Sequence, residues 1–351
     1  MSRTATGNPH LVGDRGFVVL VIALAVALVL AVAFAIGIGT VDVPIGDVVG
    51  VLWAHTGGSP DTSGQNSTID QIVWTFRTPR VLLAVVAGGG LSLAGLCLQT
   101  LVRNPLADPY MFGVSAGASV GAVTALTFGA VAGLSVTGAA FVGALISVLV
   151  VFAMAQRGGR LAGGNLVLAG VGVAYLGTAI TGYIQLQADP AQLRSVVFWL
   201  LGSVTGASWA SLAVPYAATA VVALWLFGQG RTMNALSAGD DTAASLGINV
   251  NRTRIVLLVS ASLLTAAVVS TAGGIGFVGL IVPHAARLVV GPDNRKVLPV
   301  SLLGGAVFLV LVDLVARTVD RPNEMPIGVF TAAIGAPFFL ILLRRRRTGA
   351  R

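Results

Sequence analysis

Charged residues are scarce in this chain: only 10% of its 351 residues are Asp, Glu, Lys or Arg, while 56% are hydrophobic. Soluble domains carry about 25% charged residues, so this composition excludes an ordinary globular protein of the cytosol. The net charge of +8 would suggest nucleic-acid binding in a soluble protein. Here, however, the basic residues cluster at the ends of apolar runs, which is the pattern that sets membrane topology. The sequence predicts a membrane protein that contacts lipid and binds no nucleic acid.

Residue types that carry catalysis or bind metals are also few. The one cysteine, Cys97, lies inside an apolar run, so the chain cannot form an internal disulfide. The three histidines (His10, His55 and His284) lie too far apart in sequence to form a local metal motif. There is no GxxxxGK[ST] phosphate-binding loop, and no Ser–His–Asp or paired-carboxylate arrangement can be proposed. We therefore expect no catalytic residues, metal site or cofactor in this chain; if it takes part in energised transport, the energy comes from another subunit.

Long apolar runs fill most of the sequence and divide into helices at glycines, prolines and polar clusters. A membrane helix needs about 20 apolar residues, and the first run is too long for a cleavable signal, whose apolar core has roughly 7–15. Ten spans are predicted, at about 16–38, 81–102, two within 109–156, 163–186, 209–228, 255–272, 276–290, 298–316 and 327–343. A long polar loop precedes the second span, and a short, partly inserted helix is expected at about 195–205. Glycines at four-residue spacing predict tight packing on one face of the third span: Gly113, Gly117 and Gly121.

Arginines at the two ends of the chain predict its orientation. Arg344 to Arg347 follow the last span, and Arg3 and Arg15 precede the first, which places both termini in the cytoplasm. We therefore expect an all-α, polytopic membrane protein. Its parts are a cytoplasmic tail at 1–15, one ten-helix domain at 16–343 and a basic cytoplasmic tail at 344–351.

A short polar stretch, GDDTAASLG, lies between Gly239 and Gly247 and separates two long apolar runs. Its acidic start favours a helix N-terminus, and Gly247 can end that helix in a left-handed cap. Leu246 would present one apolar side chain. The topology places the stretch in a cytoplasmic loop at about 231–254. From these residues alone, a docking helix and an ordinary surface turn are equally good interpretations.

Four arginines fall on the outer side of the predicted topology: Arg77, Arg80, Arg317 and Arg321. On charge alone, pairing with Asp320 or Glu324, or with lipid phosphates, is favoured over a basic rim that receives acidic side chains of a partner. Asp313 is the one acid placed within a span, and it lies four residues before Arg317, so the two can pair on one helix face. Transporters driven by proton or sodium gradients usually need acids or broken helices near the membrane centre, so this pattern argues against that class.

Five segments, in order along the chain, carry a family resemblance. They are RTPRVLLAVVAGGGLSLAGLCLQTLVRNPLADPYMFGVSAGASVGA (77–122), GDDTAASLG (239–247), GGIGFVGLIVPHAARL (273–288), DLVAR (313–317) and EMPIGVFTAAIGAPFFLILL (324–343). Together they resemble the FecCD-type permeases, the membrane subunits of ATP-driven importers for iron–siderophores, haem and vitamin B12. The resemblance covers about 77–343, which is nearly the whole chain.

The resemblance implies a protein of the bacterial cytoplasmic (inner) membrane and a fold like that of the vitamin B12 permease, with ten helices per subunit and two permeases around one pathway. The second permease is either a copy of this chain or a related protein. Two cytoplasmic ATPase subunits, which use ATP and Mg, and an extracytoplasmic solute-binding protein complete the importer. The coupling helix toward the ATPase would comprise Gly239, Asp240, Asp241, Ala243, Leu246 and Gly247. The family usually has two glutamates where this chain has Asp240 and Asp241, a change that keeps the charge.

The resemblance also assigns roles on the outer side and in the pathway. Arg77, Arg80 and Arg317 would receive glutamates of the binding protein, whereas Arg321 lies outside the matched pattern. His284 is expected to have a structural role at the break made by Pro283. Polar residues of span five are the candidates for the substrate pathway: Asn165, Thr178, Thr181 and Gln185. An iron–siderophore is the expected cargo, with cobalamin or haem as alternatives, and a proton-coupled secondary transporter is the alternative of a different class.

Overall fold

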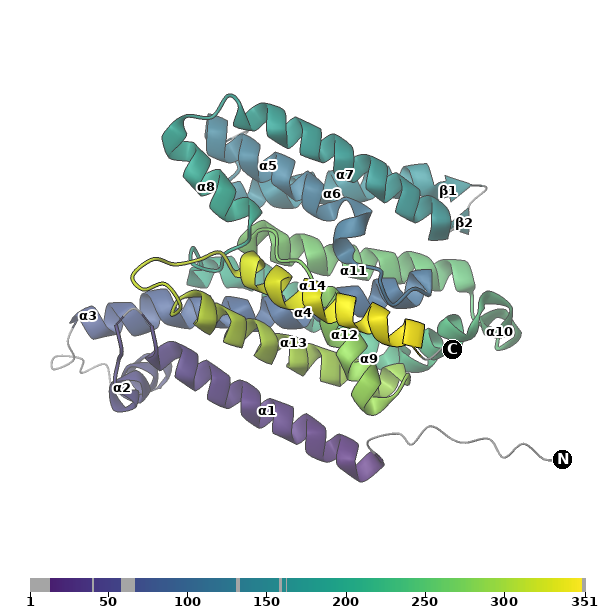
Figure 1. Cartoon of the computed structure of the whole chain (residues 1–351), viewed down its shortest axis with the longest axis horizontal. Helices are drawn as coiled ribbons and strands as arrows, with labels where there is room; N and C mark the ends of the chain where they lie inside the picture. The colour runs from purple at the N-terminus through teal and green to yellow at the C-terminus, as the bar shows by residue number, and fades with distance from the viewer. Residues whose placement is uncertain are drawn as a thin grey trace.

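The computed structural model describes residues 13–39, 41–57, 67–130, 133–157, 160–161 and 163–348. Most of the predicted N-terminal tail, including Arg3 and His10, lies outside the described residues, as do positions 349–351 of the C-terminal tail. The described chain is built almost entirely of helices, and most of them run along the long axis of the molecule (Figure 1). The all-α prediction is therefore confirmed.

The elements follow one another in the order that the apolar runs predict. They are α1 (Asp14–Gly37), α2 (Ile45–Thr56), α3 (Ser67–Asp70), the π-helical η1 (Gln71–Arg77), α4 (Thr78–Val102), the 3-10 turn η2 (Pro109–Phe112), α5 (Val114–Phe128), α6 (Val136–Ala155), β1 (Gln156–Arg157), β2 (Arg160–Leu161), α7 (Gly163–Gln185), α8 (Pro190–Leu200), α9 (Trp209–Ala238), α10 (Asp240–Ser245), α11 (Val250–Ala272), α12 (Val278–Val290), α13 (Asn294–Ala316) and α14 (Ile327–Thr348). The two short strands pair antiparallel, with Gln156 opposite Leu161, and connect α6 to α7.

Among the described residues, 7 helices are long and apolar enough to cross a membrane. Three shorter apolar helices, α5, α12 and the first part of α14, occupy the places of the remaining predicted spans. The long and the short helices together account for the ten predicted spans. The lengths and composition therefore describe a polytopic membrane protein.

Helix α4 is the centre of the bundle. It packs against α13, α11, α12 and α9. Of the most apolar 18-residue stretch in the continuous helix Thr68–Val102, 89% is buried. Glycines bring its backbone against its neighbours: a Cβ added to Gly88 would lie 2.1 Å from the carbonyl oxygen of Gly305 on α13, and one added to Gly95 would lie 1.9 Å from that of Gly279 on α12. Such backbone contact is the role that small residues have between membrane helices.

Helices α5, α6 and α7 form a second group, which α8 joins at one end (Figure 1). The predicted tight packing of span three is confirmed at two of its glycines. An added Cβ at Gly117 would lie 2.3 Å from the carbonyl oxygen of Gly143 on α6, and one at Gly121 would lie 2.1 Å from that of Ala139. Gly113 does not share this face. It precedes α5 with φ +72°, because the chain must turn there from η2 into the helix.

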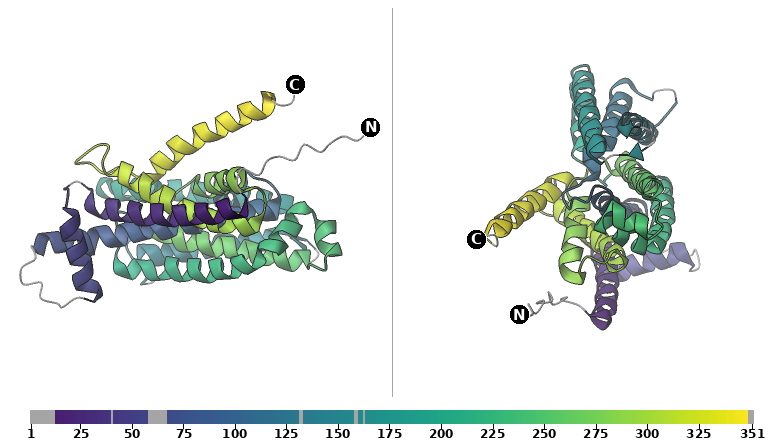
Figure 2. Two further views of the ribbon diagram at one scale, coloured as in Figure 1. Left: turned by 90° about the horizontal axis from the view of Figure 1, so that it is seen from below. Right: turned by 90° about the vertical axis from the view of Figure 1, so that its right-hand side faces the viewer.

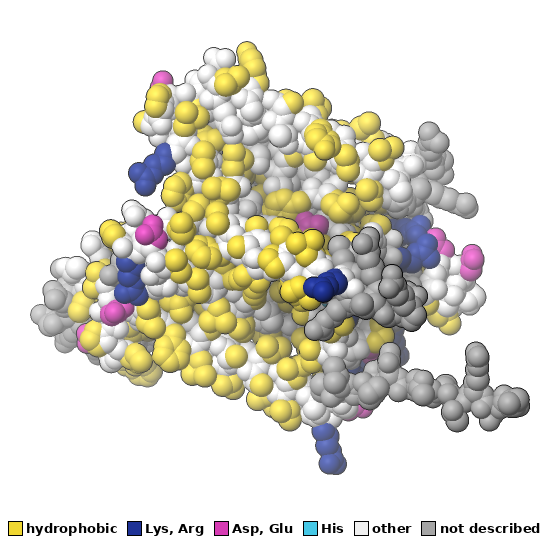
Figure 3. Space-filling model, in the orientation of Figure 1, with side chains coloured by type: hydrophobic (Ala, Val, Ile, Leu, Met, Phe, Trp, Pro, Cys, Tyr) yellow, Lys and Arg dark blue, Asp and Glu magenta, His cyan; other side chains and the backbone are white. Residues whose placement is uncertain are grey.

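The two ends of the bundle differ, and we call the end that carries α10 the inner end and the other the outer end. Helix α1 begins and α14 ends at the inner end, as an even number of spans requires, while α2 and α3 lie at the outer end (Figure 1). Helix α14 stands away from the other helices and packs only against α13 and α12 among its larger contacts (Figure 2). On the face drawn in Figure 3, hydrophobic side chains cover the middle, and most charged side chains lie toward the two ends.

The segment before the second span differs from the predicted loop. It contains α2, and helix begins again at Ser67, so that Arg77 and Arg80 lie inside a helix and not at its mouth. One face of α2 explains this, because Val48 and Val51 are buried with Val73 in a cluster that also covers the outer end of α1. The sequence did not predict α2 because its apolar face is short, is surrounded by polar residues, and packs against residues far away in the chain.

The helices on both sides of the coupling loop are longer than predicted, and the partly inserted helix is shifted toward the N-terminus. Helix α9 continues to Ala238 and α11 starts at Val250, so the predicted coupling loop at 231–254 is reduced to the residues between them. The first turn of α11 is capped by Asn249, whose Oδ1 accepts a hydrogen bond from the backbone N–H of Arg252 at 3.0 Å. The partly inserted helix starts earlier than predicted, at Pro190, because Asp189 and Gln192 form a capping box there.

Candidate functional site

The predicted coupling segment is a separate helix at the inner end, α10. Gly239 (φ +131°) opens it and Gly247 (φ +77°) ends it, conformations that favour glycine. Ala243 is fully buried against the bundle, whereas the side chain of Leu246 is 67% exposed. The helix therefore presents one large apolar side chain outward while its small residue packs inward, and the predicted left-handed cap at Gly247 is confirmed.

Asp240 ties the start of α10 to two membrane helices. Its Oδ1 accepts a hydrogen bond from Nη2 of Arg254 on α11 at 3.0 Å, and it lies 3.7 Å from Nη1 of Arg103, the residue that follows α4. Asp241 is exposed. Sequence reasoning treated the two acids as equivalent and missed both arginines, because nothing in the local pattern shows which acid faces the bundle.

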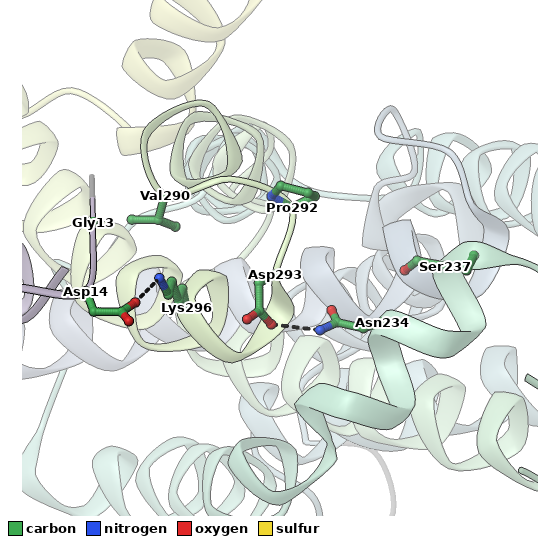
Figure 4. Close-up of a pocket in the computed structure, with 9 residues that line it drawn as sticks. Gly13, Asp14, Asn234, Ser237, Val290, Pro292, Asp293 and Lys296 are labelled. Carbon is green, nitrogen blue, oxygen red and sulfur yellow. Dashed lines mark hydrogen bonds and ion pairs between the residues drawn. The ribbon is translucent and has the colours of Figure 1, made fainter. Parts of the chain in front are cut away.

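A cavity of about 720 Å³ lies beside the start of α10 at the inner end (Figure 4). Its polar walls pair with each other: Lys296 Nζ donates to Asp14 Oδ1 at 2.6 Å, and Asn234 Nδ2 donates to Asp293 Oδ1 at 2.7 Å. Burial would raise the pKa of Asp293, but the hydrogen bond from Asn234 and the nearby positive charges hold the pKa below its usual value. Asp293 therefore keeps its negative charge in this wall.

Arg80 forms the centre of a buried ionic cluster at the outer end. It donates through Nε to Asp313 Oδ1 at 3.0 Å and through Nη1 to Glu324 Oε2 at 2.8 Å. Arg317 pairs with the other oxygen of Asp313, which confirms the predicted pair on one helix face. The side chain of Asp313 is fully buried, whereas that of Glu324 is 29% exposed. Glu324 is therefore the part of the cluster that another protein could reach.

Arg77 and Arg317 also hold the outer end of α1. Arg77 Nη1 donates to the carbonyl oxygens of Ile36 and Gly37 at 2.9 Å and 2.7 Å. Arg317 Nη1 donates to the carbonyl oxygen of Ala35 at 2.9 Å. Hydrogen bonds of this kind satisfy carbonyl groups at a helix end, which have no partner within the helix. The three predicted docking arginines thus come together around a cavity of about 270 Å³, but each is buried and bonded within the chain.

The predicted pathway residues separate into two places. Thr178, Thr181 and Gln185 of α7 line a cavity of about 210 Å³ with Ser119 of α5. The hydroxyl of Thr181 is buried and has no hydrogen-bond partner among the described residues. Asn165 lines a different cavity, of about 440 Å³, between α6 and α7. The first three thus form a polar wall toward the outer end, and Asn165 is separated from it by about 20 Å of helix.

An aromatic column at the outer end was missed by sequence reasoning. The rings of His55 and Trp74 stack with their centroids 4.3 Å apart, and Trp209 lies 4.4 Å from Trp74 on the other side. His55 Nε2 lies 2.8 Å from Asp70 Oδ1, and Trp209 Nε1 donates to the carbonyl oxygen of Trp74 at 3.0 Å. The column joins α2, η1 and α9, which no local pattern connects.

The helical bundle and its long apolar helices define a multi-pass membrane protein. Residues 27–345 match the FecCD transport family, and the chain belongs to this family. It is therefore a permease subunit of an ABC importer, a transport component and not a catalytic one.

Individual relatives agree with this assignment. The chain is 46% identical over 292 residues to the cobalamin import system permease protein BtuC of Halobacterium salinarum, covering 83% of this chain and 78% of that protein. It is 38% identical over 294 residues to the hemin transport system permease protein HmuU of Yersinia pestis, covering 80% and 87%. A solved inward-facing structure assigned to the metal-chelate type of ABC transporter is similar over 93% of this chain and 99% of its own, with 29% identity and a TM-score of 0.79.

Proposed function

We propose that this subunit imports a metal-chelate cargo across the cytoplasmic membrane and that α10 transmits ATP-driven movement from a cytoplasmic ATPase dimer. The observation that carries the proposal is the exposed Leu246, which projects from a short helix whose other face is buried. The other exposed side chains of this segment are small or polar, so Leu246 is the large apolar side chain that a docked partner would bury there. The ATPase would use ATP and Mg, and the inner end would face the cytoplasm.

Replacement of Leu246 by Asp tests the docking of α10. The variant should insert into the membrane normally but lose the ATPase during purification, because a carboxylate cannot be buried in an apolar pocket without a partner. Leu134, 37% exposed in the turn between α5 and α6, provides the control substitution Leu134→Asp. ATP-driven uptake by the Leu246→Asp variant at the wild-type rate would refute the coupling role.

At the outer end we propose that an extracytoplasmic binding protein docks over the ionic cluster of Arg77, Arg80 and Arg317. Glu324 already bonds to Arg80, so an acidic side chain of the partner would compete with it. Glu324→Gln should therefore strengthen docking at low salt, since it frees a positive charge. Reversing the arginines themselves would also break the fold, so the Glu324 variant is the sharper test. If the wild-type permease and the Glu324→Gln variant bind the binding protein with equal affinity at low ionic strength, the docking role is contradicted.

A second permease subunit is proposed to cover α7 and α14. Apolar side chains of α7, including Leu168, Tyr175 and Leu176, are between 62% and 76% exposed, and α14 exposes Leu340 and Ile341. Both helices lie at the outside of the bundle (Figure 2). A paired subunit would bury them and would enclose the pathway, with Thr178, Thr181 and Gln185 as its candidate lining. Cross-linking of cysteines introduced on α14 would detect such a pair.

The cargo is proposed from what the relatives are named for. Cobalamin and hemin are both metal–chelate complexes, and the relative named for cobalamin is the more similar of the two. Cobalamin is therefore the first cargo to test, and iron–siderophores, expected from the family resemblance, come next in the same assay. Uptake would be measured in cells with and without this chain, each with the ATPase active or inactivated. Uptake that needs the chain but survives loss of the ATPase, and fails when the proton gradient collapses, would favour a secondary transporter.

A further inference from the structure

The two neighbouring acids at the start of α10 have different surroundings. Asp241 is exposed to solvent. Asp240 lies against the bundle, and its side chain is 40% exposed. The two side chains are chemically identical, so their different surroundings indicate different roles. Asp240 contacts the membrane helices, and Asp241 is free to contact a partner.

One oxygen of Asp240 connects α10 to two helices. Oδ1 lies 3.0 Å from Nη2 of Arg254, on the first turns of α11, and 3.7 Å from Nη1 of Arg103, at the end of α4. The side chain of Arg254 is only 13% exposed, so this pair is partly screened from water. Arg103 has φ 54°, and this left-handed conformation turns the chain at the inner end of α4.

We propose that Asp240 is a positioning residue that fixes the coupling helix to α4 and α11, so that a movement of α10 is transmitted to both. The inference rests on the proposed docking of α10 on an ATPase. It assigns Asp240 to transmission within the permease, and it leaves Asp241 and Leu246 to the surface that meets the ATPase.

The size of α10 makes such an anchor necessary. Six residues are too few for a helix to hold its shape or position alone. Ala243 buries very little surface, and the connections at Gly239 and Gly247 are glycines, which bend easily. Without the ionic contact, α10 could shift with the ATPase while α4 and α11 stayed in place.

Helix α10 packs mainly against α9, and the ionic contact adds α11 and the end of α4 to the helices that can receive the movement. Helix α4 is the most buried of the candidate spans, and its outer part carries Arg80, which bonds to Asp313 and Glu324. One helix therefore has an ionic contact to the coupling helix at its inner end and an ionic cluster near its outer end. A displacement applied through Asp240 acts on the centre of the bundle and not on its periphery.

The test uses the full importer, with its ATPase and binding protein, in proteoliposomes. ATP hydrolysis and uptake of cobalamin are measured in the same preparation. For Asp240→Asn we expect the ATPase to remain bound and to hydrolyse ATP, while uptake per ATP hydrolysed falls about fivefold, the factor that corresponds to the upper range for a partly exposed ion pair. Asp240→Glu, which keeps the charge, should restore most of the ratio.

Asp241→Asn removes the same charge one residue away and gives the contrast. It should weaken binding of the ATPase and leave uptake per ATP unchanged. If Asp240→Asn does not assemble, Arg103→Gln tests the same contact at a half-exposed side chain, with a fall of about twofold expected for the longer pair. A wild-type ratio in Asp240→Asn or in Arg103→Gln overturns the proposal, and so does loss of the ATPase from Asp240→Asn that Asp240→Glu fails to restore. Failure of the proposed docking would appear instead as a wild-type permease that does not retain the ATPase.

Discussion

Replacement of Gly88 by Ala should loosen the contact at the centre of the bundle. The new Cβ would lie 2.1 Å from the carbonyl oxygen of Gly305 and 2.7 Å from its carbonyl carbon. Both neighbours are backbone atoms, so no side-chain rotation can relieve the overlap. Ordinary contact begins at 3.4 Å, and α4 and α13 must therefore separate by about 1.3 Å at this point.

The cost can be worked from the two effects of the methyl group. Overpacking of a close contact typically costs about 1–3 kcal/mol. Alanine is favoured over glycine inside a helix by about 0.5–1 kcal/mol, which offsets part of that cost. We expect the variant to be less stable by about 1–2 kcal/mol. The separation also pulls Arg80 on α4 away from Asp313 on α13, whose bond of 3.0 Å tolerates little movement.

Thermal unfolding of the purified protein in detergent, followed by tryptophan fluorescence, measures this change. Gly172→Ala is the matched control, because Gly172 is in helix α7 and an added Cβ there meets nothing within 4 Å. That control should be as stable as the wild type or slightly more so. A Gly88→Ala protein that unfolds at the temperature of the Gly172→Ala protein would show that the backbone contact has no energetic importance.

Three further predictions concern polar groups. Burial raises the pKa of Asp108 to about 6 from 3.8, so the folded state binds a proton that the unfolded state has released, and stability falls as pH rises from 3.8 to 6. Asp108→Asn should abolish this dependence of stability on pH. At pH 7.5 the variant should be more stable than the wild type by on the order of 2–3 kcal/mol and should melt at a higher temperature, whereas at pH 4 the two should melt alike. Asp313→Asn should cost about 3–5 kcal/mol, measured by the fraction that survives heating in detergent, since it leaves two buried arginines with less compensation; stability equal to wild type would exclude a structural role for the cluster. Trp209→Phe should lower stability by about 1 kcal/mol through loss of its N–H donor, and a Trp209→Phe protein with wild-type unfolding would show that the aromatic column needs only stacking.

Local signals predicted those parts of the fold that depend on local chemistry. The glycines around α10 marked both of its ends, because a positive φ there favours glycine. The apolar runs predicted α7 and α12 to within two residues, since glycines, prolines and polar clusters mark where these runs begin and end. Thr178, Thr181 and Gln185 come together because spacings of three and four place them on one helix face.

The failures arise where distant residues decide the outcome. Charge alone favoured pairing of an outer arginine with Glu324, and this is confirmed, but the burial of Arg80 was not expected because Glu324 lies 244 residues away. Helix α2 forms because α1 and η1 cover its face, although the surrounding segment is polar. Asn165 shares a helix with the other pathway candidates but faces another cavity, which depends on where α6 packs. Arg103 and Arg254 acquire their importance only from the fold of the chain around Asp240.

Helix α14 has a consequence for how cells handle this protein. Its larger contacts within the subunit are with α13 and α12, and at its start the N–H groups of Ile327 and Gly328 donate to the carbonyl oxygens of Gly202 and Leu201. If the proposed second subunit covers α14, a copy without that subunit holds this helix mainly at its outer end. Such a copy would then be a substrate for membrane proteases that extract weakly held helices from the bilayer. Selective degradation of unpaired copies would limit the number of subunits that lack a partner.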